Sequence, residues 1–155
     1  MKIKLLHVLA ILLAVGWMVL IFTLSAQSAE ESGGLSALIS TPVTNAIASW
    51  QGIEDTAALY QQVDGVVRTT AHFSEYAVLG ALVLLACRSI GIRWRWLPLL
   101  IGGLYAVVDE WHQSFSPGRV SDPADVLIDA CGVFFGSMLT YLIIKVRRKN
   151  HVHHR

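Results

Sequence analysis

Charged residues are scarce in this sequence. Asp, Glu, Lys and Arg make up 15% of its 155 residues, whereas hydrophobic residues make up 54%. Soluble globular domains carry about 25% charged residues. The composition therefore excludes an ordinary soluble domain and indicates a single membrane domain, residues 1–155.

Cysteine is also rare, with two residues in the whole chain, Cys87 and Cys131. These cysteines fall at different depths of the helices described below, so their side chains are too far apart for a disulfide bond. We interpret both as packing residues of the protein core. No internal repeat is present either.

Four apolar stretches are long enough to cross a bilayer as helices. About 20 helical residues, at about 1.5 Å each, span the roughly 30 Å hydrocarbon core. The stretches are residues 5–24, 68–87, 96–115 and 124–144. The first is longer than the apolar part of a typical signal peptide, so we expect an uncleaved helix. The sequence predicts an all-α integral membrane bundle of four transmembrane helices.

The long connection between the first two spans, residues 25–67, is too polar to cross the membrane. Glycine and proline weaken helices, and this segment contains Gly33, Gly34, Pro42 and Gly52. We therefore expect it to be broken into short pieces at these residues. Apolar residues then recur at helical spacing, at Leu59, Val63, Val66 and Val67. This pattern predicts an amphipathic helix over 54–67 that lies on the outer face of the membrane, as part of a helical outer cap.

Basic and acidic residues are segregated along the chain. Of the twelve Lys and Arg residues, all but Arg68 and Arg119 lie in the segments 2–4, 88–95 and 145–155, at alternate helix ends. Cytoplasmic loops are enriched in Lys and Arg, so we expect a multi-pass protein with both termini in the cytoplasm. All eleven acidic residues then fall on the outer side.

Three of the predicted spans reach the length needed to cross the bilayer only if they include ionisable residues. The uncharged run 76–87 covers only about 18 Å, and the runs 96–108 and 130–144 are also too short. An ionisable group isolated in lipid costs about 2 to 3 kcal/mol or more. We therefore expect these groups to face one another in a shared polar pocket in the outer half of the membrane.

The polar residues of the second and third spans fall into helical stripes. Arg68, His72 and Glu75 have the spacing i, i+4, i+7 and occupy one face of a helix. The third span carries a comparable stripe, formed by Tyr105, Asp109, His112 and Gln113. Glu110 lies off this stripe, which leaves it free to pair with a neighbouring helix. These two stripes predict two walls of the pocket.

On the fourth span, Asp125, Asp129 and Gly132 share one side, and Gly132 with Gly136 permits close approach of another helix. Asp129 lies beyond the first helical turn, so we interpret it as a pocket residue. Asp122 precedes a proline, which is typical of a helix N-cap followed by proline at the first helical position. Both a capping role and a pocket role stay open for Asp122 and Asp125.

At these residues the chain resembles the VanZ-like family. The motifs are Arg68-x-x-x-His72-Phe73-x-Glu75-Tyr76, Asp109-Glu110-x-His112-Gln113-x-Phe115, Gly118-Arg119 and Asp122-x-x-Asp125-x-x-x-Asp129. They are specific in combination and span most of the chain. Asp129 is a departure, because asparagine is more often expected there.

The resemblance implies a bacterial cytoplasmic membrane protein from a family associated with resistance to teicoplanin-type glycopeptide antibiotics. The family is also similar to a wider group of membrane enzymes proposed to act on lipid head groups. The implied partners are a membrane lipid or lipid-linked precursor and a glycopeptide antibiotic. We expect no nucleic-acid partner.

Our first hypothesis is an enzyme that modifies the phosphate-linked head group of an outer-leaflet lipid or lipid-linked cell-wall precursor. Its catalytic candidates are His72, Glu75, Asp109, His112 and Asp129, with either histidine as general base or nucleophile and the carboxylates orienting them. Arg68 and Arg119 would bind the phosphate. The other pocket candidates are Tyr76, Tyr105, Glu110, Gln113, Asp122 and Asp125. A divalent cation held by the carboxylates stays an open option as cofactor.

Two other functions remain open. A non-catalytic protein would use the same pocket to bind a lipid or antibiotic and alter access to wall precursors. A transporter would use the acids and histidines as a proton relay. The inner halves of the spans offer no ionisable residue to complete such a relay, so the transporter is the weaker alternative.

Overall fold

The computed structural model describes residues 2–153, and this part of the chain forms five α-helices and no strand. The helices are α1 (Lys2–Ser25), α2 (Ala29–Gln51), α3 (Ala57–Ser89), α4 (Leu97–Gln113) and α5 (Pro123–His153). The all-α prediction is confirmed. The basic segment 145–155 includes Arg155, which lies outside the described residues.

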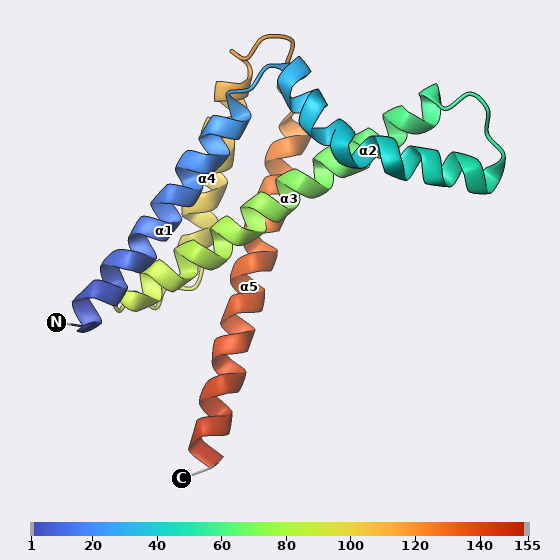
Figure 1. Cartoon of the computed structure of the whole chain (residues 1–155). Helices are drawn as coiled ribbons and strands as arrows, with labels where there is room; N and C mark the ends of the chain where they lie inside the picture. The colour runs from blue at the N-terminus through green and yellow to red at the C-terminus, as the bar shows by residue number, and fades with distance from the viewer. Residues whose placement is uncertain (1, 154–155) are drawn as a thin grey trace.

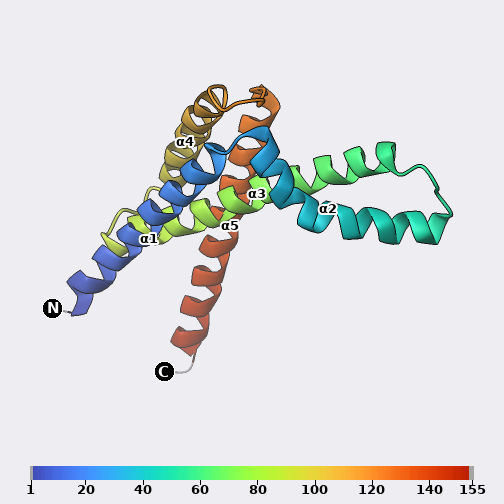
Figure 2. The same cartoon turned by 45° about the horizontal axis from the view of Figure 1, so that its top comes forward.

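The helices run back and forth between two ends of a bundle (Figure 1). α1 leads from the N-terminus to the upper end, α4 leads there again, and α5 descends from it. α2 turns away at the upper end, and α3 returns beside it and ends near the N-terminus, as Figure 2 also shows. The ends of α1 and α4 and the start of α5 therefore meet at one end of the bundle, which we call the upper end.

Three helices are long and apolar enough to cross a membrane: Leu5–Ser25 of α1, the whole of α3, and Pro123–Arg147 of α5. Most of the large apolar side chains of α1 and α5 are exposed, as expected for helices that face lipid. α4 has 17 residues, which at about 1.5 Å per residue cover about 26 Å, less than the hydrocarbon core. The structure thus shows three candidate spans of the four predicted from the sequence.

The prediction that residues 25–67 are broken into short pieces of helix was wrong. α2 is a single helix of 23 residues that contains Gly33, Gly34 and Pro42 in its interior. Its start is fixed by a capping box, in which the Glu31 amide donates to Ser28 Oγ (3.2 Å) and the Ser28 amide donates to Glu31 Oε2 (2.8 Å).

The middle of α2 packs against α3, which compensates for the hydrogen bond that Pro42 cannot donate. Ser40, Thr44 and Ala48 recur every four residues and are buried, and Ser40 Oγ donates to Asp64 Oδ1 of α3 at 2.8 Å. The predicted helix 54–67 is not a separate element, because it continues without a break into the second span to form α3. α2 and the first part of α3 form a helical hairpin that extends to one side (Figure 1).

α3 and α5 cross in close contact. A Cβ on Gly132 would overlap the carbonyl oxygen of Phe73, and one on Gly136 would overlap that of Ala77. The predicted role of these two glycines in close helix approach is confirmed. Around this crossing lies the apolar core of the protein, which includes Leu79, Val83, Ala106 and Val133.

Both cysteines are free, as predicted. Cys87 is buried in the apolar core, but Cys131 is exposed on α5. The interpretation of Cys131 as a core residue was wrong, because it lies next to Gly132 on α5, and only the glycine faces α3.

Candidate functional site

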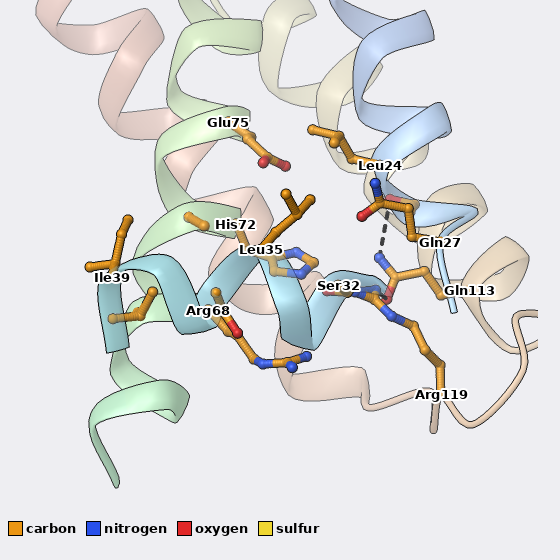
Figure 3. Close-up of a pocket in the computed structure, with 14 residues that line it drawn as sticks. Leu24, Gln27, Ser32, Leu35, Ile39, Arg68, His72, Glu75, Gln113 and Arg119 are labelled. Carbon is orange, nitrogen blue, oxygen red and sulfur yellow. Dashed lines mark hydrogen bonds between the residues drawn. The ribbon is translucent and has the colours of Figure 1, made fainter. Parts of the chain in front are cut away.

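A cavity of about 200 Å³ opens at the upper end of the bundle. Arg68, His72 and Glu75 line it from α3, as their shared stripe predicts, and Gln113 of α4 and Arg119 of the following loop add further polar groups (Figure 3). The sequence thus identified the residues of α3, α4 and the loop that meet here. We call this space the polar cavity.

The opposite wall of the polar cavity comes from α2, which the sequence interpretation did not place there. Ser32, Leu35, Ser36 and Ile39 line it (Figure 3). Their spacing over two turns is typical of one helix face. The capping-box pattern Ser28-x-x-Glu31 is the signal that would have predicted this helix, and with it these residues.

His72 links α3 to α5 through Asp129. The two atoms His72 Nδ1 and Asp129 Oδ1 lie 3.4 Å apart, close enough for an ion pair when the imidazole is protonated. The side chain of Asp129 is 2% exposed and that of His72 is 20% exposed. The imidazole ring reaches into the polar cavity (Figure 3), so the carboxylate holds the buried edge of the ring while the rest faces the cavity.

Asp109 joins three helices directly beneath the cavity. Its Oδ2 atom accepts hydrogen bonds from Ser25 Oγ of α1 (2.8 Å) and from the Tyr76 hydroxyl of α3 (3.1 Å). Gln113 Nε2 donates to Ser25 Oγ at 3.2 Å. Asp109 is 1% exposed. This carboxylate therefore fixes the relative positions of α1, α3 and α4, and it does not itself line the cavity.

The two arginines are held by short polar contacts. Arg68 Nε donates to Asp64 Oδ2 at 2.8 Å, and Arg119 donates to Gln113 Oε1 (2.9 Å) and Ser32 Oγ (2.8 Å). Both arginines also line an adjacent hollow of about 210 Å³ with His72, Gln113 and Asp125. Burial, and then the positive charge of Arg68, lower the pKa of the Arg119 guanidinium. The two positive charges therefore repel each other, and an anion bound between the arginines would offset this repulsion.

Two acidic candidates have structural partners at the loop before α5. Glu110 is buried, and its Oε1 atom accepts a hydrogen bond from the Asp122 amide at 2.6 Å. Asp122 Oδ1 accepts from the Ala124 amide at 2.8 Å, which is the hydrogen bond of an N-cap. The predicted capping role of Asp122 is confirmed, whereas Glu110 pairs with the backbone of the loop before α5 and not with a neighbouring helix. Neither residue lines the polar cavity.

The other two candidates of α4 face α1. The Tyr105 hydroxyl donates to the Met18 carbonyl at 2.6 Å. The His112 ring stacks on Phe22, with ring centroids 4.1 Å apart, and lines neither the polar cavity nor the adjacent hollow. Of the two candidate histidines, His72 is therefore the one that a ligand in the cavity would meet.

Among the residues that the structure describes, no group of three or more His, Cys, Asp or Glu side chains is arranged to hold a metal ion. A divalent cation at this site would thus need ligands from water or from the phosphate itself. The ionisable groups that line the cavity are two guanidinium groups, one imidazole and one carboxylate.

The helices and the polar cavity define the class of this protein: a multi-pass membrane protein whose buried acidic residues gather with His72 at one end of an apolar helical bundle. Within that class, the chain belongs to the VanZ/LLP1 family, which it matches over residues 10–145. No curated protein matches the chain, and no solved structure matches it.

Proposed function

We propose that the protein modifies the phosphate-linked head group of an outer-leaflet membrane lipid or lipid-linked cell-wall precursor. The observation that carries this proposal is that Arg68 and Arg119 line the same cavity as His72 and Glu75. Guanidinium groups bind phosphate through charge-assisted, often bidentate hydrogen bonds. The imidazole beside them supplies a group for proton transfer at the bound phosphate.

The lining of the polar cavity supports an amphiphilic substrate. Leu24, Leu35, Ile39 and Val67 lie on its walls together with the charged groups. Leu35 and Ile39 are also exposed on the outside of the molecule, so the apolar wall continues onto a surface that lipid would contact. A lipid could place its phosphate between the arginines while its chain stays along this apolar wall.

The chemistry follows from the pairing of His72 with Asp129. As general base, the imidazole takes the proton of a water or acceptor alcohol while the oxygen of that molecule forms the new P–O bond. The bond from phosphorus to the leaving alcohol breaks, and the protonated imidazole returns the proton to that leaving oxygen. Asp129 stabilises the transient imidazolium and keeps the ring in place, and the arginines neutralise the phosphate charge.

We further propose that α4 is a fourth crossing and that the polar cavity faces outward. α4 packs against both α3 and α5, and Trp96 and Phe115 at its ends would extend its 17 residues to the interfaces. The basic segments 2–4 and 88–95 lie at the lower end, and positive residues favour the cytoplasmic side. The α2–α3 hairpin then forms the outer cap.

A non-catalytic binder is the second candidate. The arginines are already held in place by Asp64, Gln113 and Ser32, which is the preorganisation that tight binding of a head group or antibiotic requires. The enzyme would change the wall precursors themselves, and the binder would alter access to them. Altered sensitivity to teicoplanin-type antibiotics is the cellular consequence that we propose.

The test is to incubate the purified full-length protein with a bacterial lipid extract and polyprenyl-linked precursors, with and without divalent cations, and to follow head groups by mass spectrometry. His72→Ala removes the proposed base, and His7→Ala is the matched control because His7 lies near the other end of α1. We expect a product from the unmodified protein and from His7→Ala, reduced about 100-fold or more in His72→Ala.

If no lipid or precursor is altered under any condition, the enzymatic function is wrong. Retention of one lipid by the unmodified protein, lost in Arg119→Ala but kept in His72→Ala, would instead establish the binder. Equal turnover by the unmodified protein and His72→Ala would show that the imidazole takes no part in catalysis.

A further inference from the structure

A second cavity, of about 310 Å³, lies at the opposite end of the bundle from the polar cavity. Its lining comes from the last turns of α3, the turn into α4, the start of α4, and α5. Leu84, Leu99, Phe134 and Met138 make most of its surface apolar. We call this space the lower cavity, and none of its residues belongs to the site described above.

One arginine, Arg95, lines the lower cavity, and a second, Arg88, contacts an aromatic residue of the lining. The Arg88 guanidinium lies 5.0 Å from the ring centre of Tyr141, and that of Arg95 lies 5.4 Å from the ring centre of Trp96. Both aromatic rings line the cavity, as does Arg95. These contacts hold the two positive charges over aromatic faces beside an apolar space.

Within residues 2–153, no acidic side chain pairs with these arginines. All eleven acidic residues lie within 30–75 and 109–129, and neither arginine forms an ion pair with any residue that the structure describes. Arg88 Nε is buried and has no hydrogen-bond partner within the described part of the chain. A buried donor of this kind requires a partner, because leaving it unpaired is costly.

We propose that the lower cavity binds an anionic phospholipid from the leaflet that surrounds this end of the bundle. Its phosphate pairs with Arg88 and Arg95, and one acyl chain occupies the apolar space between Leu84, Phe134 and Met138. Basic pockets between transmembrane helices bind anionic head groups in this manner. The site is separate from the polar cavity, so it stands whether or not the protein is an enzyme.

The experiment is native mass spectrometry of the full-length protein in detergent, with dioleoylphosphatidylglycerol or dioleoylphosphatidylcholine added at equal concentration. We expect the unmodified protein to retain one phosphatidylglycerol about tenfold more strongly than phosphatidylcholine. Arg88→Gln with Arg95→Gln abolishes this preference. Arg93→Gln is the matched control, because Arg93 is an exposed residue of the same turn that does not line the cavity.

Two further variants distinguish a lipid site from a simple anion site. Met138→Trp fills the apolar space while both arginines stay, so it reduces retention of phosphatidylglycerol. Arg88→Lys with Arg95→Lys keeps both charges and a preference for the anionic lipid, which controls for misfolding of the glutamine variant.

Equal retention of the two lipids by the unmodified protein would overturn the proposal. The proposal would also be overturned if Arg93→Gln lowered retention of phosphatidylglycerol as much as Arg88→Gln with Arg95→Gln does. Full displacement of the lipid by inorganic phosphate, with no effect of Met138→Trp, would show an anion site and not a lipid site.

Discussion

Nδ1 of His72 on α3 lies 3.4 Å from Oδ1 of Asp129 on α5. The pair spans the interface at which Gly132 and Gly136 bring the two helices into close contact. The backbone crossing therefore sets the distance between imidazole and carboxylate. Any change that separates α3 from α5 also separates the two groups on which the proposed chemistry depends.

Loss of the carboxylate tests this pair directly. We expect Asp129→Ala to lower kcat for head-group turnover about 100-fold with little change in KM, because the imidazole loses the group that orients it. Asp129→Asn should retain more activity, since its amide oxygen can still lie beside Nδ1 and orient the ring. Glu54→Gln, at an exposed residue of the α2–α3 connection, is the control. An equal loss in the Ala and Asn variants would contradict the orienting role.

Arg119 is the phosphate ligand most open to test, because it lies on the loop outside the spans. Arg119→Ala should weaken binding of a phosphate-linked head group about 10- to 100-fold, as expected for loss of a hydrogen bond to a charged group. Arg119→Lys should recover part of this loss, since it keeps the charge but not the planar fork. Equilibrium binding to lipid nanodiscs measures the effect, with the exposed Arg147→Ala as control. Unchanged binding in Arg119→Ala would show that Arg119 does not bind the phosphate.

Close packing of α3 on α5 predicts a stability effect. Gly136→Ala places a methyl group against the Ala77 backbone and should lower the free energy of unfolding by about 2 kcal/mol. Gly103→Ala is the matched control, because a Cβ there meets no atom within 4 Å and alanine favours a helix. Unfolding in detergent, followed by circular dichroism, compares the two. If both variants unfold like the unmodified protein, the close crossing is absent.

The capping box at α2 gives a pH dependence. Hydrogen bonds from the Ser28 amide and hydroxyl lower the pKa of Glu31 from its ordinary value of 4.5. A lowered folded-state pKa means that this stabilisation is complete above pH 4.5 and is lost as pH falls through the lowered value.

Hydrogen exchange of the first amides of α2 measures this effect. Ser28→Ala should speed their exchange about fivefold near neutral pH. The difference between the unmodified protein and Glu31→Ala should shrink as the pH is lowered. A difference that grows toward acid pH would show that the carboxylate is not the stabilising form.

The orientation in the membrane is tested with single cysteines in a background that lacks Cys87 and Cys131. Val120 is 87% exposed on the loop beside Arg119, and Arg93 is exposed in the turn at the other end of the bundle. An impermeant thiol reagent should label Val120→Cys in intact cells, and Arg93→Cys only after the membrane is opened. The opposite pattern would invert the topology.

The sequence predicts the helical class and the polar stripes because both depend on spacing along one helix. Arg68, His72 and Glu75 meet in the polar cavity for this reason. Which helix packs against each stripe depends on how the helices cross. Residue spacing along one helix does not determine that crossing. His112 shares a stripe with Asp109 yet stacks on Phe22, because α1 packs against that side of α4.

The sequence interpretation failed most clearly at α2. Gly33, Gly34 and Pro42 each weaken an isolated helix, and local propensity predicts a break at each of them. Burial of Ser40, Thr44 and Ala48 against α3 outweighs this preference, and such tertiary packing is not visible in propensity. As a consequence, an entire wall of the polar cavity was missed.

α3 is one unbroken helix of 33 residues, about 50 Å long at 1.5 Å per residue, whereas the hydrocarbon core measures about 30 Å. It is inclined to α1 and α4 (Figures 1 and 2). A helix that exceeds the bilayer adjusts its tilt to the local thickness of the membrane. His72 sits near its middle, so a thinner or thicker bilayer would change how deeply the imidazole is immersed without altering any contact within the protein.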